Sequence, residues 1–103
     1  MSQVRLSQSL VIVLGQLLAE PDQWRYGYDL SNATAVPPGT LYPLLVRLAD
    51  AGWLVAKWEE RGEGGRPPRH LYRLTASGRR AARDVIVRAT KRGWAIGLRP
   101  REA

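Results

Sequence analysis

The chain has 103 residues and a mass of 11.5 kDa, which fits a single domain with one modest hydrophobic core. It contains no cysteine, so disulfides and thiolate metal sites are excluded and a reducing, cytoplasmic setting is favoured. The formal net charge of +7 and the sequence pI of about 10.8 favour a polyanionic partner such as nucleic acid over an acidic small substrate.

The first predicted helix spans residues 6–20 and stops before Pro21. Its apolar residues recur at intervals of three and four, as on one buried helix face: Leu10, Val13, Leu14, Leu17 and Leu18. The longest apolar run, at residues 10–15, is far shorter than the ~20 residues that cross a membrane, and the amino terminus lacks the pattern of a signal peptide. We therefore expect a cytoplasmic, nucleoid-associated protein without a membrane partner.

A turn is predicted at residues 22–25, followed by a short second helix over residues 26–34. Tyr28 and Leu30 are the candidate packing residues of this helix. Nine residues pack too little surface to make it stable alone, so it depends on its neighbours.

The third predicted helix begins within the sequence "PPGTLYPLL" and ends at Gly52, which suits a left-handed cap. Its leucines at positions 41, 44, 45 and 48 follow the spacing of one buried face. The opposite face carries Tyr42, Pro43, Val46, Arg47 and Asp50. Pro38 suits a helix start, whereas Pro43 is tolerated if regular hydrogen bonding begins near Thr40 and predicts a small kink if the helix starts earlier.

A β-hairpin follows the third helix. Residues 53–60 and 70–74 alternate in polarity as half-buried strands do, whereas the glycines and prolines of residues 61–69 exclude a regular element. The predicted hairpin thus has a slim, basic tip. Trp24, Trp53 and Trp58 are interpreted as packing residues.

The positive charge is concentrated in the second half of the chain. Residues 61–92 contain ten basic and two acidic residues, which gives +8 there and −1 elsewhere. Arg66 and Arg69 lie in the hairpin tip, where they can contact phosphates and release counterions.

The last predicted helix runs from residue 76 to residue 98, which corresponds to about 35 Å. It carries an apolar stripe of Ala82, Val85, Ile86, Ala89, Gly93 and Ile96. Because the helix is longer than so small a core needs, we expect the stripe beyond Ala82 to form a dimer interface.

The order of these elements predicts a mainly α, α+β fold: a winged helix-turn-helix with a two-stranded wing. Residues 1–75 would form the DNA-binding part and residues 76–103 the dimerisation helix and tail of one compact domain. In such a domain the third helix enters the major groove and the wing meets the adjacent backbone. Thr40 could bond a phosphate or a base edge, and Gly39 lets the amides of the helix backbone approach a phosphate. Arg47 is better placed to contact the DNA backbone than a base.

Three blocks resemble the signature of the PadR family of transcriptional regulators: "RYGYDL" at 25–30, "GTLYPLLVRLADAGWL" at 39–54 and "GRPPRHLYRLTASGR" at 65–79. The resemblance implies a homodimeric repressor of double-stranded DNA operators whose dimer is built from the last helix, helped by the first. Carried over by position, it makes Tyr26, Gly39, Thr40 and Tyr42 DNA-facing and Arg66 and Arg69 wing contacts. A single helix after Thr75 resembles the short branch of the family. Some short relatives bind flat aromatic effectors between subunits through a tryptophan of the last helix, a part that Trp94 could play.

No enzyme, cofactor or metal site is predicted. His70 is the only histidine, Glu59 and Glu60 point to opposite strand faces, and the glycine-rich residues 62–67 lack the ending of a P-loop. Two other functions remain: a basic RNA-binding or ribosome-associated protein, which would need aromatic residues exposed on a sheet face, and a winged-helix module for protein contacts, which would not need an arginine-rich wing.

Overall fold

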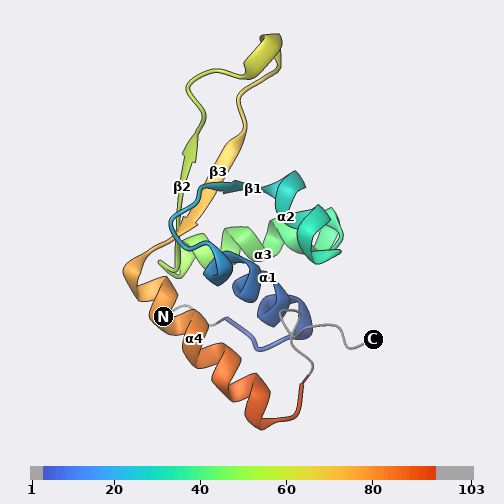
Figure 1. The fold of residues 1–103 in the computed structure, drawn as a ribbon, viewed down its shortest axis with the longest axis vertical. Coiled ribbons are helices and arrows are strands. Elements are labelled where there is room, and N and C mark those ends of the chain that lie inside the picture. Colours follow the sequence, from blue (N-terminus) through green and yellow to red (C-terminus); the bar gives the residue numbers. More distant parts are fainter. Residues whose placement is uncertain (1–3, 95–103) are drawn as a thin grey trace.

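Four helices and a three-stranded antiparallel sheet make up residues 4–94, the part of the chain that this computed structural model describes (Figure 1). The elements in chain order are α1 (Gln8–Ala19), β1 (Arg25–Tyr26), α2 (Gly27–Thr34), α3 (Pro38–Asp50), β2 (Leu54–Trp58), the 3-10 turn η1 (Glu63–Gly65), β3 (His70–Leu74) and α4 (Ala76–Lys91). This is the winged helix-turn-helix order, so the predicted α+β fold is confirmed.

The core lies where α1, α3, α4 and the base of the sheet meet. The four leucines of α3 are buried in it, together with the apolar face of α1. Burial of each such side chain contributes roughly 1.5–3 kcal/mol relative to exposure. The leucine face therefore fixes α3 to the core and leaves its other face at the surface. Within residues 4–94, no helix is both long enough and apolar enough to span a membrane.

The sheet has one more strand than the sequence predicted. β1 occupies part of the expected turn and pairs with β3, so that the strand order is β1-β3-β2. Arg25 of β1 is only 8% exposed and donates hydrogen bonds to the Asp29 carboxylate and to the backbone and side-chain oxygens of Gln16. The buried guanidinium thereby ties α1, β1 and α2 together at the foot of the wing.

Helix α3 begins earlier than Thr40. Pro37 is its N-cap, Pro38 its first residue, and the Leu41 N–H donates to the Pro37 carbonyl at 2.9 Å. Pro43 therefore lies inside the helix, where its ring replaces the N–H that would have bonded to the Gly39 carbonyl. The helix thus starts two residues before Thr40, which is the second of the two alternatives that the sequence left open, although the first N–H groups of α3 to donate are those of Thr40 and Leu41, both to the Pro37 carbonyl.

Helix α4 is shorter than predicted. It ends at Lys91 instead of residue 98, and Gly93 adopts a left-handed conformation with φ of 78°. The Trp94 N–H then donates to the Ala89 carbonyl at 3.0 Å, which closes the helix end. Gly93 is thus a helix terminator and not part of a helical stripe. Sixteen residues give a helix of about 24 Å.

Trp53 joins the recognition half of the fold to α4. Its N–H donates to the Leu48 carbonyl at the end of α3, and its carbonyl accepts from the Thr75 N–H at the start of α4. Gly78 packs so closely on the Trp53 carbonyl that a Cβ atom there would overlap it. Trp53 therefore connects the two helices, together with Gly52, whose carbonyl accepts from the Thr75 and Ser77 hydroxyls.

The wing is a hairpin that projects away from the helices (Figure 1). β2 and β3 pair in register from Leu54 with Leu74 to Trp58 with His70. At the tip, Gly64 and Gly65 adopt positive φ angles of 61° and 83°, which only glycine adopts without strain. The wing thus holds residues 59–69 well outside the core.

Candidate nucleic-acid interface

The exposed face of α3 holds the residues that the sequence singled out. Gly39, Thr40 and Arg47 are exposed, and Tyr42 is 44% exposed. Val46, on the same face, is 55% exposed although it is apolar. The sequence places Val46 on this face, but Val46 is not among the predicted DNA-facing residues. The signal that could have indicated it is an apolar residue on the otherwise polar side of a helix.

Tyr42 is fixed by the start of α2. Its ring lies directly over Gly27, where a Cβ atom would overlap the ring carbons and the hydroxyl. The tyrosine of α3 can take this position only because α2 begins with a glycine. Gly27, which is not among the residues predicted from the sequence, therefore leaves the space that the Tyr42 ring occupies.

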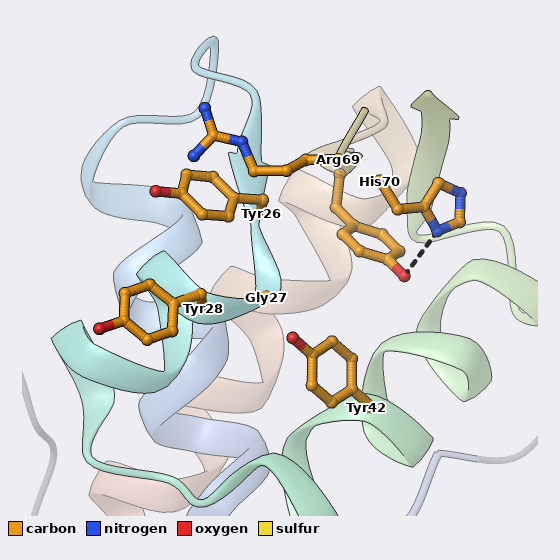
Figure 2. A pocket seen from close by; sticks show the side chains of 7 residues that line it. Tyr26, Gly27, Tyr28, Tyr42, Arg69 and His70 are labelled. Carbon is orange, nitrogen blue, oxygen red and sulfur yellow. Dashed lines mark hydrogen bonds between the residues drawn. The ribbon is translucent and has the colours of Figure 1, made fainter. Parts of the chain in front are cut away.

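A surface pocket of about 450 Å³ lies between α3 and the foot of the wing (Figure 2). Its lining combines four tyrosines with a cation and a histidine: Tyr26, Gly27, Tyr28, Tyr42, Arg69, His70 and Tyr72. Three of these residues, from β1, α3 and the wing, were expected to face DNA. The structure brings Tyr26, Tyr42 and Arg69 to one pocket although they are far apart in sequence.

Two aromatic residues expected to pack are at the surface instead. Tyr28 is 66% exposed and Trp58 is 64% exposed, so the interpretation of both as packing residues was wrong. Trp58 lies in a part of β2 that extends beyond the core. Its ring stacks on His70 with centroids 4.5 Å apart and planes at 19°.

His70 continues this aromatic row toward the pocket. Its Nδ1 lies 3.1 Å from the Tyr72 hydroxyl (Figure 2). Burial raises the pKa of the Tyr72 phenol, and the neighbouring Tyr42 adds to the increase. Tyr72 therefore keeps its proton at neutral pH and can donate a hydrogen bond.

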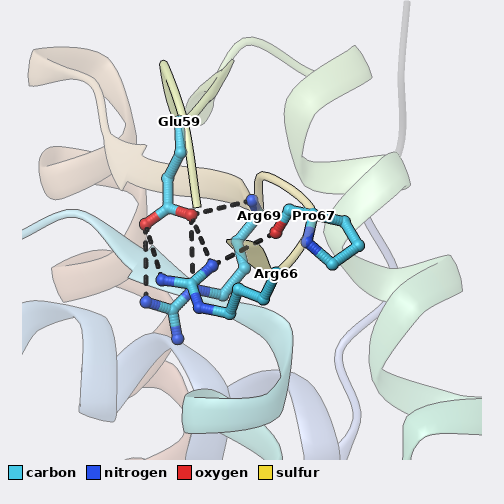
Figure 3. Close-up of polar contacts among 4 residues, drawn as sticks. All are labelled: Glu59, Arg66, Pro67 and Arg69. Atoms are coloured by element: carbon cyan, nitrogen blue, oxygen red, sulfur yellow. Dashed lines mark hydrogen bonds and ion pairs between the residues drawn. The ribbon is translucent and has the colours of Figure 1, made fainter. Parts of the chain in front are cut away.

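The two wing arginines are both paired with Glu59 (Figure 3). Arg66 Nη1 lies 2.8 Å from Glu59 Oε1, and Arg69 Nη2 lies 3.4 Å from Glu59 Oε2. The Arg69 guanidinium also covers the Tyr26 ring at 3.9 Å from its centroid, a cation–π contact. The pairing of Glu59 with these two arginines is not predictable from the sequence, because nothing in the order of residues shows which charges of a hairpin tip face one another.

The residues expected at a dimer interface are placed mostly within the single chain. Val85 and Ala89 are buried where α4 packs on α1, so neither offers contact area to a second copy, which corrects the expectation for these two. Ile86 is partly buried at the edge of the core, and Gly93 is exposed beyond the helix end. Ile96 lies outside the described residues.

Trp94 is partly buried and packs against the core beyond α4.

Among residues 4–94, no three histidine, cysteine or acidic side chains gather as metal ligands would. The pocket and the exposed face of α3 present hydroxyls, guanidiniums and aromatic rings.

A family model described as "Transcriptional regulator PadR-like family" matches residues 16–84. The chain belongs to this family. The matched range spans β1, α2, α3, the wing and the first half of α4. It includes the pocket and the cluster of Glu59, Arg66 and Arg69, called the Glu59 cluster below. PadR-like proteins are DNA-binding transcriptional regulators and not enzymes, which confirms the sequence interpretation at that level.

Other solved structures share the fold of this PadR-like chain. Smu.1704 from Streptococcus mutans UA159 is 29% identical, with a TM-score of 0.60 over 87% of this chain and 81% of its own. A Streptococcus transcriptional regulator is 22% identical, with a TM-score of 0.64 over 82% of this chain and 84% of its own.

MepR, a transcription regulator of the Staphylococcus aureus multidrug efflux pump MepA, is 17% identical, with a TM-score of 0.67 over 85% of this chain and 61% of its own. The similarities to the Streptococcus transcriptional regulator and to MepR, at 22% and 17% identity, show the winged-helix fold alone. No protein of curated function matches the chain.

Proposed function

We propose that this PadR-like protein is a homodimeric repressor that binds a specific operator, with α3 in the major groove and the wing on the adjacent backbone. The observation that carries the proposal is the meeting of Tyr26, Tyr42 and Arg69 at one pocket between α3 and the wing. If α3 lies in the major groove of a duplex, the sugar-phosphate backbone of that duplex would run past this pocket.

The start of α3 would read the operator. Thr40 and Tyr42 bring hydroxyls to the exposed face, which can bond to base edges or phosphates, and Val46 brings methyl groups that suit the C5-methyl of thymine. Arg47, one position further along the helix, is suited to a phosphate. Gly39 leaves open space at the helix start for a phosphate to approach the backbone.

Selection of bound sequences from a random duplex pool, followed by titration, would test this function. The protein is titrated with the selected duplex, a scrambled duplex and a matched RNA at two salt concentrations. We expect the selected duplex to bind on the order of 10³-fold more tightly than the scrambled one. Equal affinity for all three would exclude sequence-specific regulation.

Replacement of Thr40 and Tyr42 by alanine should remove the discrimination between the selected and scrambled duplexes. Both side chains are exposed, so the substitutions leave the leucine face and the core intact. The matched control is Arg47→Ala, which should weaken binding to both duplexes alike. Retained discrimination in the double variant would mean that another surface reads the sequence.

The dimer would be built from α4 and the amino-terminal part of the chain, as the family resemblance implies. Apolar residues remain partly exposed there after the core is formed: Val4, Leu6, Ile12 and Ile86. The proposed interface therefore uses the edge of α4 that holds Ile86 and not the face that holds Val85.

An effector role for Trp94 belongs to the same proposal. The indole is partly buried at the end of α4. Planar aromatic compounds should quench the fluorescence of the wild-type protein and not that of a folded Trp94→Leu variant. Equal quenching in both would remove Trp94 from consideration.

RNA binding is the second candidate function, because Trp58 and His70 present a stacked aromatic pair on the sheet. Exposed aromatic side chains on a sheet are what single-stranded RNA stacks on. The RNA arm of the titration addresses this candidate: preference for RNA over the selected duplex, lost in Trp58→Ala, would favour it.

A further inference from the structure

Glu59 lies immediately after β2 and holds both wing arginines (Figure 3). Besides the two ion pairs, its Oε1 accepts a hydrogen bond from the Arg69 backbone N–H at 2.9 Å, and the Glu59 N–H donates to the Arg69 carbonyl at 2.8 Å. Its side chain is 20% exposed. One carboxylate thus closes the open end of the hairpin and neutralises part of its charge.

The sequence of the tip brings the two arginines to this carboxylate. Two prolines separate them, and proline-rich backbone has about three residues per turn, so residues three apart lie on the same side. Gly62 allows the Arg66 carbonyl to approach so closely that a Cβ atom would overlap it. The cluster is therefore a product of the whole tip and not a chance surface contact.

The cluster changes the charge that the wing offers to DNA. Residues 57–73 contain five basic and three acidic residues, a net charge of +2. Hydrogen bonds from the Arg66 side chain, then from the Arg69 backbone, lower the pKa of the Glu59 carboxyl to about 2. The carboxylate is consequently ionised throughout the physiological range, and the three clustered residues together carry +1.

We propose that Glu59 is a specificity-determining residue: it occupies the place of a DNA phosphate between Arg66 and Arg69 and withholds them from arbitrary duplex. Non-specific binding depends almost entirely on phosphate contacts, so a wing with paired arginines contributes little to it. A cognate site adds the contacts of α3, which offset the loss of the Glu59 pairs. This inference rests on the proposed function and adds to it the control of non-specific binding.

The direct test compares Glu59→Gln with Glu60→Gln on a random-sequence duplex over a range of salt concentrations. Gln keeps an oxygen acceptor for the Arg69 N–H but no charge, and Glu60 is an exposed neighbour with no ion pair described. We expect Glu59→Gln to steepen the slope of log K against log salt by about 0.9 for each arginine released, with affinity on the order of threefold to tenfold higher. Glu60→Gln should change the slope much less.

A second comparison shows whether the effect passes through the arginines. In a background of Arg66→Gln and Arg69→Gln, the Glu59→Gln substitution should alter the slope no more than Glu60→Gln does. An additional effect there would mean that Glu59 influences DNA binding without the two arginines, and would overturn the proposal.

Glu59→Asp keeps the charge and shortens the reach, so it tests geometry alone if the Gln variant fails to fold. It should raise non-specific affinity to a value between those of wild type and Glu59→Gln. Weaker binding by Glu59→Gln or Glu59→Asp would show that Glu59 positions the arginines for DNA, the opposite of this proposal. Because random duplex needs no operator, failure to find an operator would count against the proposed function and leave this measurement decisive for Glu59.

Discussion

Two glycines near the recognition surface illustrate how one residue type serves two purposes. Gly27 is required by packing, because a Cβ atom would overlap the Tyr42 ring. Gly39 has open space around its Cβ position, so nothing within the described structure requires glycine there. The proposed DNA contact would supply a reason for glycine at position 39, because a phosphate could approach the backbone there.

The two glycines therefore predict opposite results for alanine substitution. Gly27→Ala should displace the Tyr42 ring and lower stability by no more than about 1 kcal/mol, because the overlapping atoms are the far end of a 44% exposed side chain. Gly39→Ala should leave stability unchanged or raise it by up to about 1 kcal/mol, since alanine is the better helix former. Binding of the selected duplex by Gly39→Ala should fall on the order of tenfold, as for loss of one charge-assisted hydrogen bond. Urea denaturation and duplex titration measure the two effects, and a Gly39→Ala variant with unchanged binding would contradict the role of the helix start.

The Glu59 cluster predicts a pH dependence at the residue scale. The pKa of Glu59 is lowered from 4.5 to about 2, so its ionised form stabilises the folded wing. That contribution is fully present above pH 4.5 and is lost as the pH falls through 2. Carboxyl carbon NMR should therefore show Glu59 titrating at about pH 2 instead of at the ordinary glutamate value of 4.5. Titration of Glu59 at the ordinary value would show that the cluster does not persist in solution.

At the scale of the element, α4 depends on its N-cap residue, Thr75. The Thr75 hydroxyl accepts from the Gly78 N–H at 2.9 Å and donates to the Gly52 carbonyl at 2.7 Å. Thr75→Ala loses both the helix cap and the bond to the end of α3, and should lower the free energy of unfolding by about 1–2 kcal/mol. Thr75→Ser keeps the hydroxyl and should lose much less. Urea midpoints compare the three proteins, and equal losses in both variants would mean that the Thr75 methyl matters more than the cap.

The elements also show what the sequence could and could not predict. The leucine spacing of α3 predicted its buried and exposed faces correctly, because a 3.6-residue period records burial directly. Alternation in β2 separated two faces but could not show that the end of the strand extends past the core, so Trp58 was misplaced. β1 has only two residues, too few for any period, and owes its position to the buried Arg25.

The end of α4 was predictable in principle. Gly52 was recognised as the left-handed cap of α3, and Gly93 has the same signal after α4. It was overlooked because glycine also fits an apolar stripe. The candidate site was predicted residue by residue on α3 and the wing, but the pocket and the Glu59 cluster arise from contacts between distant segments, which no local pattern contains.

At the scale of the whole molecule, the proposed dimer depends on which apolar surface is left after folding. Ile86 is partly buried at the edge of α4, whereas the neighbouring Val87 is 50% exposed. On a helix Val87 falls beside Arg83, Asp84 and Lys91, on the charged face.

Sedimentation equilibrium should therefore give a mass of twice 11.5 kDa for the wild-type protein. Ile86→Ala should weaken self-association about tenfold or more, as expected when an apolar side chain is truncated at an interface core. Val87→Ala, the same kind of change one position away, should have little effect. A stronger effect of Val87→Ala would place the interface on the charged face of α4.

Trp53 gives these separate surfaces a common mechanical connection. Its N–H donates to the Leu48 carbonyl in the last turn of α3, and its carbonyl accepts from the N–H of Thr75, the N-cap of α4. Gly78 packs against that carbonyl so closely that a Cβ atom would overlap it. If the proposed dimer or an effector tilts α4, we expect the movement to reach α3 through residues 52 and 53, because the start of α4 is hydrogen-bonded to the carbonyls of both. The connection from α4 to the proposed DNA-binding helix is therefore two residues long.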